Sequence, residues 1–422
     1  MDIQSIISNS LTAIFLLIVI SYYFLLIKKA KRKYSKEKFS SISIIIPAHN
    51  ESKYIVDCLK SVVAARFPGK KEIIVIDDGS KDRTYDIAKN FISKYCKDDD
   101  IKLLKHKHSG KADTVNKGLK IAKGELIATV DADSIIEKES LVEAIKLFHN
   151  KKVAVVCSIV KVKNRKSVIG MWLHVEQLYN SLLRSLFSKI NVNIVAPGPL
   201  SLYRKKQLED IGGFSNKGFS EDVDVALRFI KKGYTVECAE KCVSETNMPI
   251  DIQGFFRQRR RFARGWINIF KRHLRINHTF IQIYTLPLAF FGYLQAIVFG
   301  FLTIYNLTSG YITYFASKGI YFNEHVVKFV LEWFSIIGII NWFSRVISGI
   351  DPLTVITVIG IAASLLVYPL YIWSIIKYDK HISFWHIIPL FFMFPFWFVI
   401  MIVYLINLPE LFIKHQHNIW TK

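Results

Sequence analysis

Cysteine, proline and glycine are all scarce in this chain of 422 residues. Eleven prolines and 20 glycines are too few for a collagen-like or low-complexity chain. The five cysteines form no C-x-x-C pair, so we expect reduced thiols rather than a zinc site or a disulfide framework. The sequence also lacks a Walker-type loop, His-rich metal spacing and any Ser-His-Asp ordering. It therefore carries no signature of a P-loop enzyme or of a hydrolase with a catalytic triad.

Acidic residues are also in short supply. The chain has 34 Asp and Glu against 57 Lys and Arg, a formal net charge of +23, and most of the surplus lies in the first 270 residues. A basic chain can bind nucleic acid, a membrane surface or an anionic small substrate. We expect no nucleic-acid partner, because the basic residues are not interleaved with an aromatic platform. Membrane lipid and an anionic substrate remain the expected partners.

Long apolar runs are absent between residues 40 and 277 but flank that region on both sides. Leu11 to Ile27 is almost wholly apolar, and five basic residues follow within six positions. A signal peptide has its positive charge before the apolar core and a small-residue cleavage site after it, which is the reverse of this order. We therefore expect a retained anchor whose C-terminal end lies in the cytoplasm, by the positive-inside bias.

The composition turns apolar again after Thr279. We expect four spans, at about 280–305, 327–349, 353–376 and 384–408, because each reaches the roughly 20 residues needed to cross the hydrocarbon core. The second is the weakest, because it contains Glu332, Asn341 and Arg345; it could instead lie on the interface or line a polar path.

These runs predict three regions. Residues 1–39 form an N-terminal transmembrane anchor with a basic linker, 40–278 a cytoplasmic domain with juxtamembrane helices at its end, and 279–422 a C-terminal region of about four spans and a cytoplasmic tail. We expect an integral membrane protein, most naturally of the cell membrane, with its polar domain in the cytoplasm.

The polar region alternates short apolar runs with helical patterns. The expected strands are Ile42–Ile46, Glu72–Ile76, Leu126–Val130 and Val153–Val156. The expected helices between them are Tyr54–Ala65, Arg83–Tyr95, Ala112–Ala122 and Ser140–Phe148. Such alternation predicts an α/β domain with a mostly parallel sheet. Polar clusters follow the strands, where open α/β sheets bind their ligands.

Two acidic clusters end strands of the predicted sheet. Asp131-Ala132-Asp133 follows Leu126–Val130, and on extended backbone two carboxylates at i and i+2 point the same way. Their oxygens suit Mg²⁺ or Mn²⁺, although a simple turn with Ser134 capping the next helix would look alike. Asp77-Asp78-Gly79-Ser80 ends a second strand and could accept from a ribose hydroxyl or a base N–H; its alternative is a β-turn before a capped helix.

Two further clusters precede or lie on helices. Ser220-Glu221-Asp222-Val223-Asp224 could supply a general base, or simply an N-cap with acids in the first turn. Lys111, in Lys107–Asp113, opens the helix after the third strand and could contact a phosphate or base, or be solvated.

The densest basic cluster lies just before the first C-terminal span. Gln258, Arg261 and Phe262 share one face of a helix, and Arg264 continues it. Guanidinium groups there could hold a pyrophosphate and the aromatic ring could stack on a sugar or lipid. The alternative is a juxtamembrane patch that attracts anionic lipid.

The order of these motifs resembles that of the family 2 inverting glycosyltransferases, and within them the membrane-embedded synthases of hyaluronan, chitin, cellulose and poly-N-acetylglucosamine. Ile44-Ile45-Ile46-Pro47-Ala48-His49-Asn50-Glu51 comes first. The motifs beginning at Asp77, Gly110, Asp131, Ser220 and Gln258 then follow in sequence. The likeness covers about residues 40–275 and the layout of the flanking spans. It implies a GT-A-like, Rossmann-type mixed sheet joined to an α-helical transmembrane region.

The resemblance also implies roles for individual residues. The donor nucleotide would lie against a pocket that includes His49, Glu51, Asp77, Asp78, Lys111 and Asp131. Asp133 would hold the metal beside the diphosphate, with Mg²⁺ or Mn²⁺ as cofactor, and Asp222 would be the catalytic base. Gln258, Arg261, Phe262 and Arg264 would lie near the acceptor and the leaving diphosphate. Ala196–Arg204 is similar to the acceptor-side segment of hyaluronan and chitin synthases, or is a simple turn and strand.

The chain departs from the family at several motif positions. Phe262 stands where the family has Trp, which keeps a stacking face but loses the indole N–H donor. Ala48 and His49 stand where many relatives have Thr and Tyr, and Ser220 replaces a common Thr or Gly. These changes bear on processivity more than on the chemistry.

The resemblance implies transfer of a sugar from a UDP-sugar donor to a growing β-linked polysaccharide, with coupled translocation. Transfer of one sugar to a lipid acceptor, as in ceramide or polyprenyl-phosphate enzymes, is the alternative. A non-enzymatic membrane scaffold or channel is a remote one. The identity of the sugar, the linkage, the product length and the oligomeric state are not encoded in these motifs.

Overall fold

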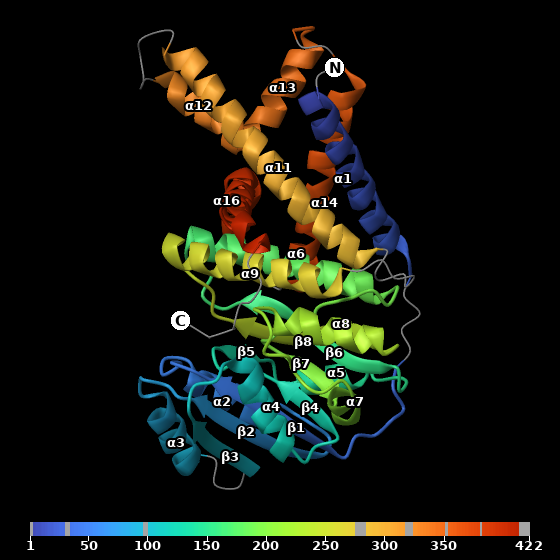
Figure 1. Cartoon of the computed structure of the whole chain (residues 1–422), viewed down its shortest axis with the longest axis vertical. Helices are drawn as coiled ribbons and strands as arrows, with labels where there is room; N and C mark the ends of the chain where they lie inside the picture. The colour runs from blue at the N-terminus through green and yellow to red at the C-terminus, as the bar shows by residue number, and fades with distance from the viewer. Residues whose placement is uncertain are drawn as a thin grey trace.

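A mixed eight-stranded sheet forms the centre of the computed structural model, which describes residues 3–29, 34–95, 100–274, 284–316, 324–350, 353–379 and 382–412 (Figure 1). The strands lie in the order β3-β2-β1-β4-β7-β6-β8-β5. Their bounds are β1 Ser41–Ala48, β2 Lys70–Asp78, β3 Asp100–His106, β4 Leu126–Thr129, β5 Ser134–Ile136, β6 Val153–Val162, β7 Ser201–Arg204 and β8 Thr235–Thr246. Four of the seven pairings that these strands form are parallel, which confirms a mixed, mostly parallel sheet.

The central strands form because their residues are β-branched and apolar on both faces. Within β1, every residue from Ile42 to Ala48 is buried. Such runs suit a parallel strand that is covered on both sides. The sequence predicted β1, β2, β4 and β6, but not β3, β5 and β8. Only five of the twelve residues of β8 are hydrophobic, so its apolar content gave little signal.

Helices cover the sheet on both faces. On one face α2 (Ile55–Ala64), α3 (Thr84–Tyr95) and α5 (Ser140–Ile145) pack against the even-numbered isoleucines of β1. On the other face α4 (Lys111–Ile121), α7 (Lys205–Asp210) and α8 (Glu221–Lys231) pack around Ile45, Ile74 and Ile76. This layering places the N-termini of α4 and α8 beside the carboxyl ends of the parallel strands, where ligands bind in open α/β sheets.

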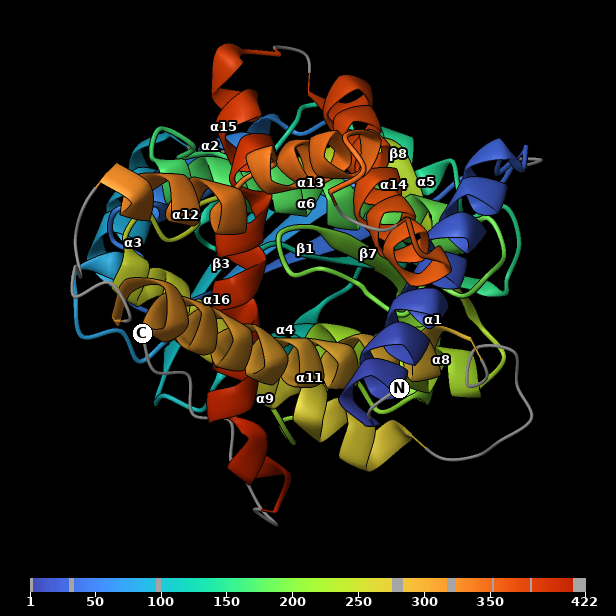
Figure 2. The ribbon, with the colours of Figure 1, turned by 90° about the horizontal axis from the view of Figure 1, so that it is seen from above.

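Two long helices separate the sheet from the apolar helices. α6 (Val168–Ser188) and α9 (Ile252–His273) lie between the two layers (Figure 1). The amphipathic α9 carries the predicted basic cluster, whereas α6 was not predicted. Seen from above, α1 (Ile3–Ile27), α14 (Val355–Tyr378) and α16 (Met393–Ile406) lie over this pair (Figure 2). Side chains of α1, α6, α14 and α16 share one apolar cluster, so the two layers are packed together.

Three helices are long and apolar enough to cross a membrane. They are α1, α11 (Thr285–Tyr311) and α14, and up to five spans result if two bent helix pairs each count as one. The bent pairs are α12 (Glu324–Phe334) with α13 (Ile337–Ile347), and η2 (Phe384–His386) and α15 (Ile387–Phe391) with α16. The π-helical turn η1 (Ile312–Ala316) ends α11, and η3 (Leu408–Leu411) follows α16. By length and composition these helices are candidate membrane spans.

The second predicted span, 327–349, is a bent pair of helices that counts as one span only if both halves are taken together. It breaks at Ser335, and its halves meet at 91°. The break pairs two of the three polar residues that made this segment the weakest candidate, since Asn341 Nδ2 donates to Glu332 Oε1 at 2.9 Å. Gly338 permits the fold-back, because a Cβ there would lie far inside van der Waals contact with the Glu332 carbonyl oxygen. The expected span 384–408 is also bent, by 53° between Phe391 and Met393.

The N-terminal helix is fastened to α6 at its last turn. Lys189, just after α6, donates from Nζ to the carbonyl oxygens of Leu25, Leu26 and Lys28 at 2.8–3.2 Å. A cation suits these carbonyls because they carry the negative end of the helix dipole. Cys58, Cys157, Cys238 and Cys242 are free thiols, as expected, while Cys96 and the tail from 413 lie outside the described residues.

Candidate active site

The predicted donor residues gather where β1, β2 and β4 end. Asp78 is the last residue of β2 and is completely buried. Its Oδ1 accepts from the backbone N–H of Ser109 at 2.8 Å, and its Oδ2 accepts from that of Gly110 at 2.9 Å and from His108 Nδ1 at 2.9 Å. Burial alone would raise the pKa of Asp78, but these backbone donors outweigh it and hold that pKa below its usual value. Asp78 thus stays charged and ties β2 to the loop before α4.

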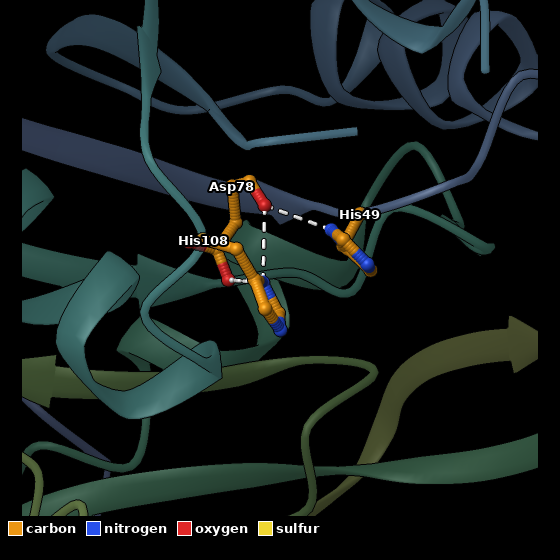
Figure 3. Close-up of side chains that lie close together, drawn as sticks. All are labelled: His49, Asp78 and His108. Atoms are coloured by element: carbon orange, nitrogen blue, oxygen red, sulfur yellow. Dashed lines mark hydrogen bonds and ion pairs between the residues drawn. The ribbon is translucent and has the colours of Figure 1, made fainter. Parts of the chain in front are cut away.

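Two histidines stack beside this carboxylate (Figure 3). The rings of His49 and His108 have centroids 4.2 Å apart and an interplanar angle of 23°. His49 Nδ1 donates to the backbone oxygen of Asp78 at 2.8 Å. His49 was a predicted donor residue, whereas His108 was missed. Its contacts with Asp78 and His49 depend on the loop after β3, which brings His108 beside the ends of β2 and β1.

Asp77 and Glu51 are also buried at this edge. Asp77 Oδ2 accepts from the Ser80 N–H at 3.3 Å, while Oδ1 is buried and has no hydrogen-bond partner among the described residues. An unpaired buried carboxylate oxygen is costly, so it is a natural acceptor for a ligand hydroxyl or N–H. Glu51 lies one turn before α2, and its backbone N–H donates to Thr84 Oγ1 at 2.7 Å. Asp82 Oδ1 accepts from the backbone N–H of Thr84, the first residue of α3, at 3.0 Å.

Lys111 connects the sheet edge where β1, β2 and β4 end, which we call the donor edge, to the acidic residues at the start of α8. Its Nζ lies 2.5 Å from Asp131 Oδ1 and 3.3 Å from Glu221 Oε1. Burial opposes its charge, but the carboxylates of Asp131, Glu221 and Asp222 together raise the pKa of Lys111 well above its ordinary value. One fixed ammonium group therefore faces acids from both β4 and α8. The sequence placed Lys111 in the pocket, but it did not reveal Glu221 as its second partner.

The backbone at Asp131-Ala132-Asp133 is a turn, not the extended segment that the sequence predicted. The Ser134 N–H donates to the Asp131 oxygen at 2.9 Å, and Ser134 begins β5 instead of capping a helix. Asp133 nevertheless stays beside its neighbour: burial and the charge of Asp131 raise its pKa from 3.8 to about 6. Ser134 and Thr246 donate to Asp133 Oδ1 at 3.2 and 3.3 Å. A pair of partly buried carboxylates, one of them poorly neutralised, has the oxygen chemistry that a hard divalent cation requires.

Asp222 lies in the first turn of α8. Its Oδ1 accepts from the backbone N–H of Val223 at 2.9 Å, and its own carbonyl oxygen accepts from the Ala196 N–H at 3.3 Å. Burial and the charge of Glu221 raise the pKa of Asp222 from 3.8 to about 6. Ser220 is the N-cap, as predicted, but its side chain makes no capping bond. A carboxylate whose pKa approaches neutrality is suited to general-base work.

Gly198 lies against the Lys111–Asp131 pair. A Cβ at this position would lie inside van der Waals contact with Asp131 Oδ2 and Lys111 Nζ. The segment 196–204 thus forms part of the same site, and it ends in β7 as the turn-and-strand interpretation held. A side chain at position 198 would therefore have to displace the ends of the Asp131 and Lys111 side chains, and the glycine is explained by this close approach rather than by an unusual dihedral angle.

We therefore expect Gly198→Ala to reduce turnover on the order of 100-fold, because a displacement of about 1 Å at reacting groups has that effect. The measurement is the initial rate of nucleotide release by the purified full-length protein. Gly292→Ala is the matched control, because a Cβ there meets no atom within 4 Å and the rate should not change. Equal rates for wild type and Gly198→Ala would remove this segment from the site.

The basic cluster on α9 divides into buried and exposed members. Gln258, Phe262 and Arg264 are partly buried, and Arg261 is exposed. Gln258 Nε2 donates to Met248 Sδ at 2.9 Å, while its Oε1 is buried with no hydrogen-bond partner in the described parts of the chain. The Arg261 guanidinium lies over the Phe262 ring, 5.6 Å from its centroid. The Arg264 guanidinium lies 5.9 Å from the ring centroid of Phe219, just before the Asp222 segment. Arg264 thus connects α9 to the start of α8, whereas Arg261 forms no ion pair with an acidic group among the residues that the structure describes.

Sequence reasoning missed the residues that hold α9 in place. Arg259 is buried and makes a bidentate pair with Glu176 of α6, with Nη1 at 2.6 Å from Oε1. At the other end of α9, His273 Nε2 and Arg272 Nη2 lie 2.8 and 2.9 Å from Asp224 Oδ1. Arg259 sits in a run of basic residues, so composition could not distinguish it from its exposed neighbours.

Comparison with known proteins gives a family match within the sheet region. The family described as Glycosyl transferase family 2 matches residues 43–212. A poly-beta-1,6-N-acetyl-D-glucosamine synthase of Staphylococcus epidermidis is 29% identical over 257 residues, which are 58% of this chain and 60% of that protein. The protein of the same name from Staphylococcus aureus strain COL is 28% identical over 261 residues, 59% of this chain and 61% of that one. The chain thus matches about three fifths of the length of these curated relatives.

A solved structure shares the whole fold. The mannosyltransferase PcManGT from Pyrobaculum calidifontis, in complex with GDP-Man and Mn²⁺, superposes with a TM-score of 0.61 at 18% identity. The superposition covers 96% of this chain and 98% of that one, so the likeness includes the apolar helices. Residues 43–212 therefore match the glycosyltransferase family 2 model, and the chain has a GT-A-like fold built on a mixed sheet.

Proposed function

We propose that this protein is a membrane-bound inverting glycosyltransferase that moves a sugar from a UDP-sugar to a growing β-linked polysaccharide. One observation carries the proposal: the Lys111 ammonium group bridges Asp131 of the donor edge and Glu221 beside Asp222. This bridge brings the predicted donor, metal and base residues into one charged site. The named synthase relatives support a polysaccharide product, and the apolar helices support a site at the inner face of the cell membrane.

The residues divide the reaction between them. Asp77, with its unpaired buried oxygen, and His49 and Glu51 at the same edge bind the nucleoside, while Asp78 holds the edge together. Asp222 takes the proton from an acceptor hydroxyl, whose oxygen attacks the anomeric carbon from the face opposite the diphosphate. The bond from that carbon to the diphosphate oxygen breaks and UDP leaves, so an α-linked donor gives a β-linked product. Gln258, Arg261 and Phe262 bind the acceptor side, and Lys111 and Arg264 supply positive charge for the leaving group.

Asp133, with Asp131 beside it, would hold Mg²⁺ or Mn²⁺. Their carboxylate oxygens fit a hard cation: the pKa of Asp133 is raised by burial and then by the charge of Asp131, and a cation would relieve that repulsion. When bound, the metal ion offsets the charge of the diphosphate and makes it a better leaving group.

The testing experiment is a donor screen on the full-length protein in native-like membranes. UDP-N-acetylglucosamine, UDP-glucose, UDP-glucuronic acid and GDP-mannose are each supplied with Mg²⁺, Mn²⁺ or EDTA, and nucleotide release and product size are measured. We expect UDP release with one UDP-sugar, a polymeric product, and loss of release in EDTA. If the product is instead a lipid that carries one sugar, the acceptor is a lipid and the polysaccharide part of the proposal is overturned. No nucleotide release with any donor would overturn the enzymatic proposal.

The pH profile of transfer should show an acid limb near pH 6. Asp222 acts only as the carboxylate, and its pKa of about 6 lies above the ordinary 3.8, so activity is present above pH 6 and falls as the pH drops through that value. In Glu221→Gln the like charge beside Asp222 is gone, so the limb should shift to lower pH. The measurement is kcat against pH at saturating donor. A limb at the same pH in both proteins would show that Glu221 does not set it.

A further inference from the structure

A buried cluster of charged side chains joins the end of α14 to α6, away from the active site. Asp379 follows α14 directly, and its Oδ2 lies 2.8 Å from His174 Nε2 on α6 and 3.1 Å from His386 Nε2 in η2. Arg165 Nη1, just before α6, lies 2.7 Å from the same oxygen. His174, Asp379 and His386 are all buried. Two of these four groups come from the glycosyltransferase region and two from the C-terminal helices.

Two histidines and a carboxylate at this spacing could also hold a metal ion. The hydrogen bonds argue for an ion pair instead. The backbone N–H of Val162 donates to His174 Nδ1 at 3.2 Å, and that of Ser383 donates to His386 Nδ1 at 3.1 Å, so the outer nitrogen of each ring is an acceptor. Ligating histidines have the reverse arrangement, with the proton on the outer nitrogen. Arg165 Nη1 lies 2.7 Å from His174 Nε2 as well as 2.7 Å from Asp379 Oδ2, and so occupies the place between the ring and the carboxylate. The Arg165 guanidinium already supplies the cation.

The electrostatics agree with a permanently charged Asp379. Burial opposes ionisation, but hydrogen bonds from His174 and His386 and the charge of Arg165 hold the pKa of Asp379 far below its usual range. Burial keeps the pKa of His174 below its ordinary value, so this ring is a neutral donor. A buried carboxylate with these partners strongly resists separation, because each one lost would leave charge uncompensated.

The opposite side of α6 contacts α9, the helix that carries Gln258, Arg261 and Phe262. His174 and Glu176 are two positions apart, which is about 200° around a helix, so they face opposite sides. Glu176 makes the bidentate pair with Arg259 of α9, next to Gln258 and one turn from Phe262. Tyr179, one turn further along α6, stacks on Tyr371 of α14 with centroids 4.2 Å apart. α6 is therefore clamped between the end of α14 and α9.

We propose that Asp379 and His174 are positioning residues for the acceptor: by clamping α6 they fix α9, and with it Gln258, Arg261 and Phe262, over the active site. The proposal rests on the proposed glycosyl transfer. The donor residues lie on or just after β1, β2 and β4 and at the start of α4, and in the described parts of the chain the hydrogen bonds of Asp379 join it to Arg165, His174 and His386 and to none of these elements. Release of the clamp should therefore affect the acceptor side and leave the donor side unchanged.

The test compares Asp379→Asn with wild type in the full-length protein in membranes. Asparagine keeps the shape and loses the charge. We expect KM for an oligosaccharide acceptor to rise roughly tenfold, as for a coupling carried through one packed helix, and the product to shorten, with KM for the donor unchanged. Asp379→Glu should restore part of the effect. Asp210→Asn, an exposed acid paired with Lys232 at 3.5 Å, is the matched control and should behave as wild type.

Arg165→Gln provides a second variant in case Asp379→Asn does not fold, and it should change the same acceptor parameters. Equal losses for donor and acceptor would indicate a merely structural role and overturn the proposal, as would unchanged acceptor parameters in a folded variant. One equivalent of a transition metal in the purified protein, lost in His174→Gln, would also overturn it in favour of a metal site. A wild-type protein without any transfer would instead contradict the proposed function.

Discussion

Asp222→Asn should lower the rate of sugar transfer by roughly 100- to 10,000-fold, the range that general-base catalysis contributes. The amide has nearly the same shape, and its oxygen can still accept the N–H of Val223, so the first turn of α8 should persist. Only the ability to take a proton from the acceptor hydroxyl is lost. Donor binding should survive, because the nucleoside residues lie at the ends of β1 and β2. Transfer is measured as UDP release, and binding by titration with the donor.

Asp57→Asn is the matched control for this change. Asp57 is an exposed acid on α2 that pairs with Lys163 at 2.7 Å, and its loss should leave both rate and binding as in wild type. If Asp222→Asn lost donor binding together with transfer, Asp222 would be a binding residue and the base would have to be sought elsewhere. Glu221 would then be the first group to examine, since its carboxylate also faces Lys111.

The parts of the fold that the sequence predicted are those whose signal is local. β1 and β2 are runs of buried isoleucine and valine, and α2, α3 and α4 follow the helical period between turn residues. The strand β5 is only three residues long, and the pattern of β8 is dominated by polar residues, so neither has a local signature. The bend in the 327–349 segment was not predictable for a different reason. Its hydropathy is sufficient, but the Glu332–Asn341 pair and the Gly338 contact decide its shape, and both are contacts across the bend.

The site shows the same division. The motif order led to Asp77, Asp78, Lys111, Asp131, Asp133 and Asp222, and the structure brings Lys111, Asp131 and Asp222 into one electrostatic group. Contacts between residues that are far apart in the sequence were not predictable. His108 stacks on His49 across 59 positions, and Glu176 meets Arg259 across 83. The roles of the α9 residues differ for the same reason, because burial against α6 decides which arginine is structural.

Loss of one partner of the Glu176–Arg259 pair should be the most destabilising change in the chain. Both side chains are buried, and Arg259 also lies 5.0–5.6 Å from the ring centroids of Phe255, Phe262 and Phe396. Arg259→Met would leave the Glu176 carboxylate buried without its counter-charge, a change that costs about 3–5 kcal/mol in the free energy of unfolding. Thermal unfolding of the purified protein in one fixed detergent provides the measurement, as a lowered midpoint.

The double variant Glu176→Met/Arg259→Met separates the ion pair from the packing around it. Two methionines fill similar volumes among the same aromatic rings and leave no buried charge, so stability should return close to the wild-type value. A double variant as unstable as Arg259→Met would show that the guanidinium stabilises α9 through its stacking on the rings rather than through Glu176. Transfer activity then distinguishes folding from positioning. A stable double variant still lacks the bidentate contact that orients α9, so its KM for the acceptor should rise while its donor KM stays at the wild-type value.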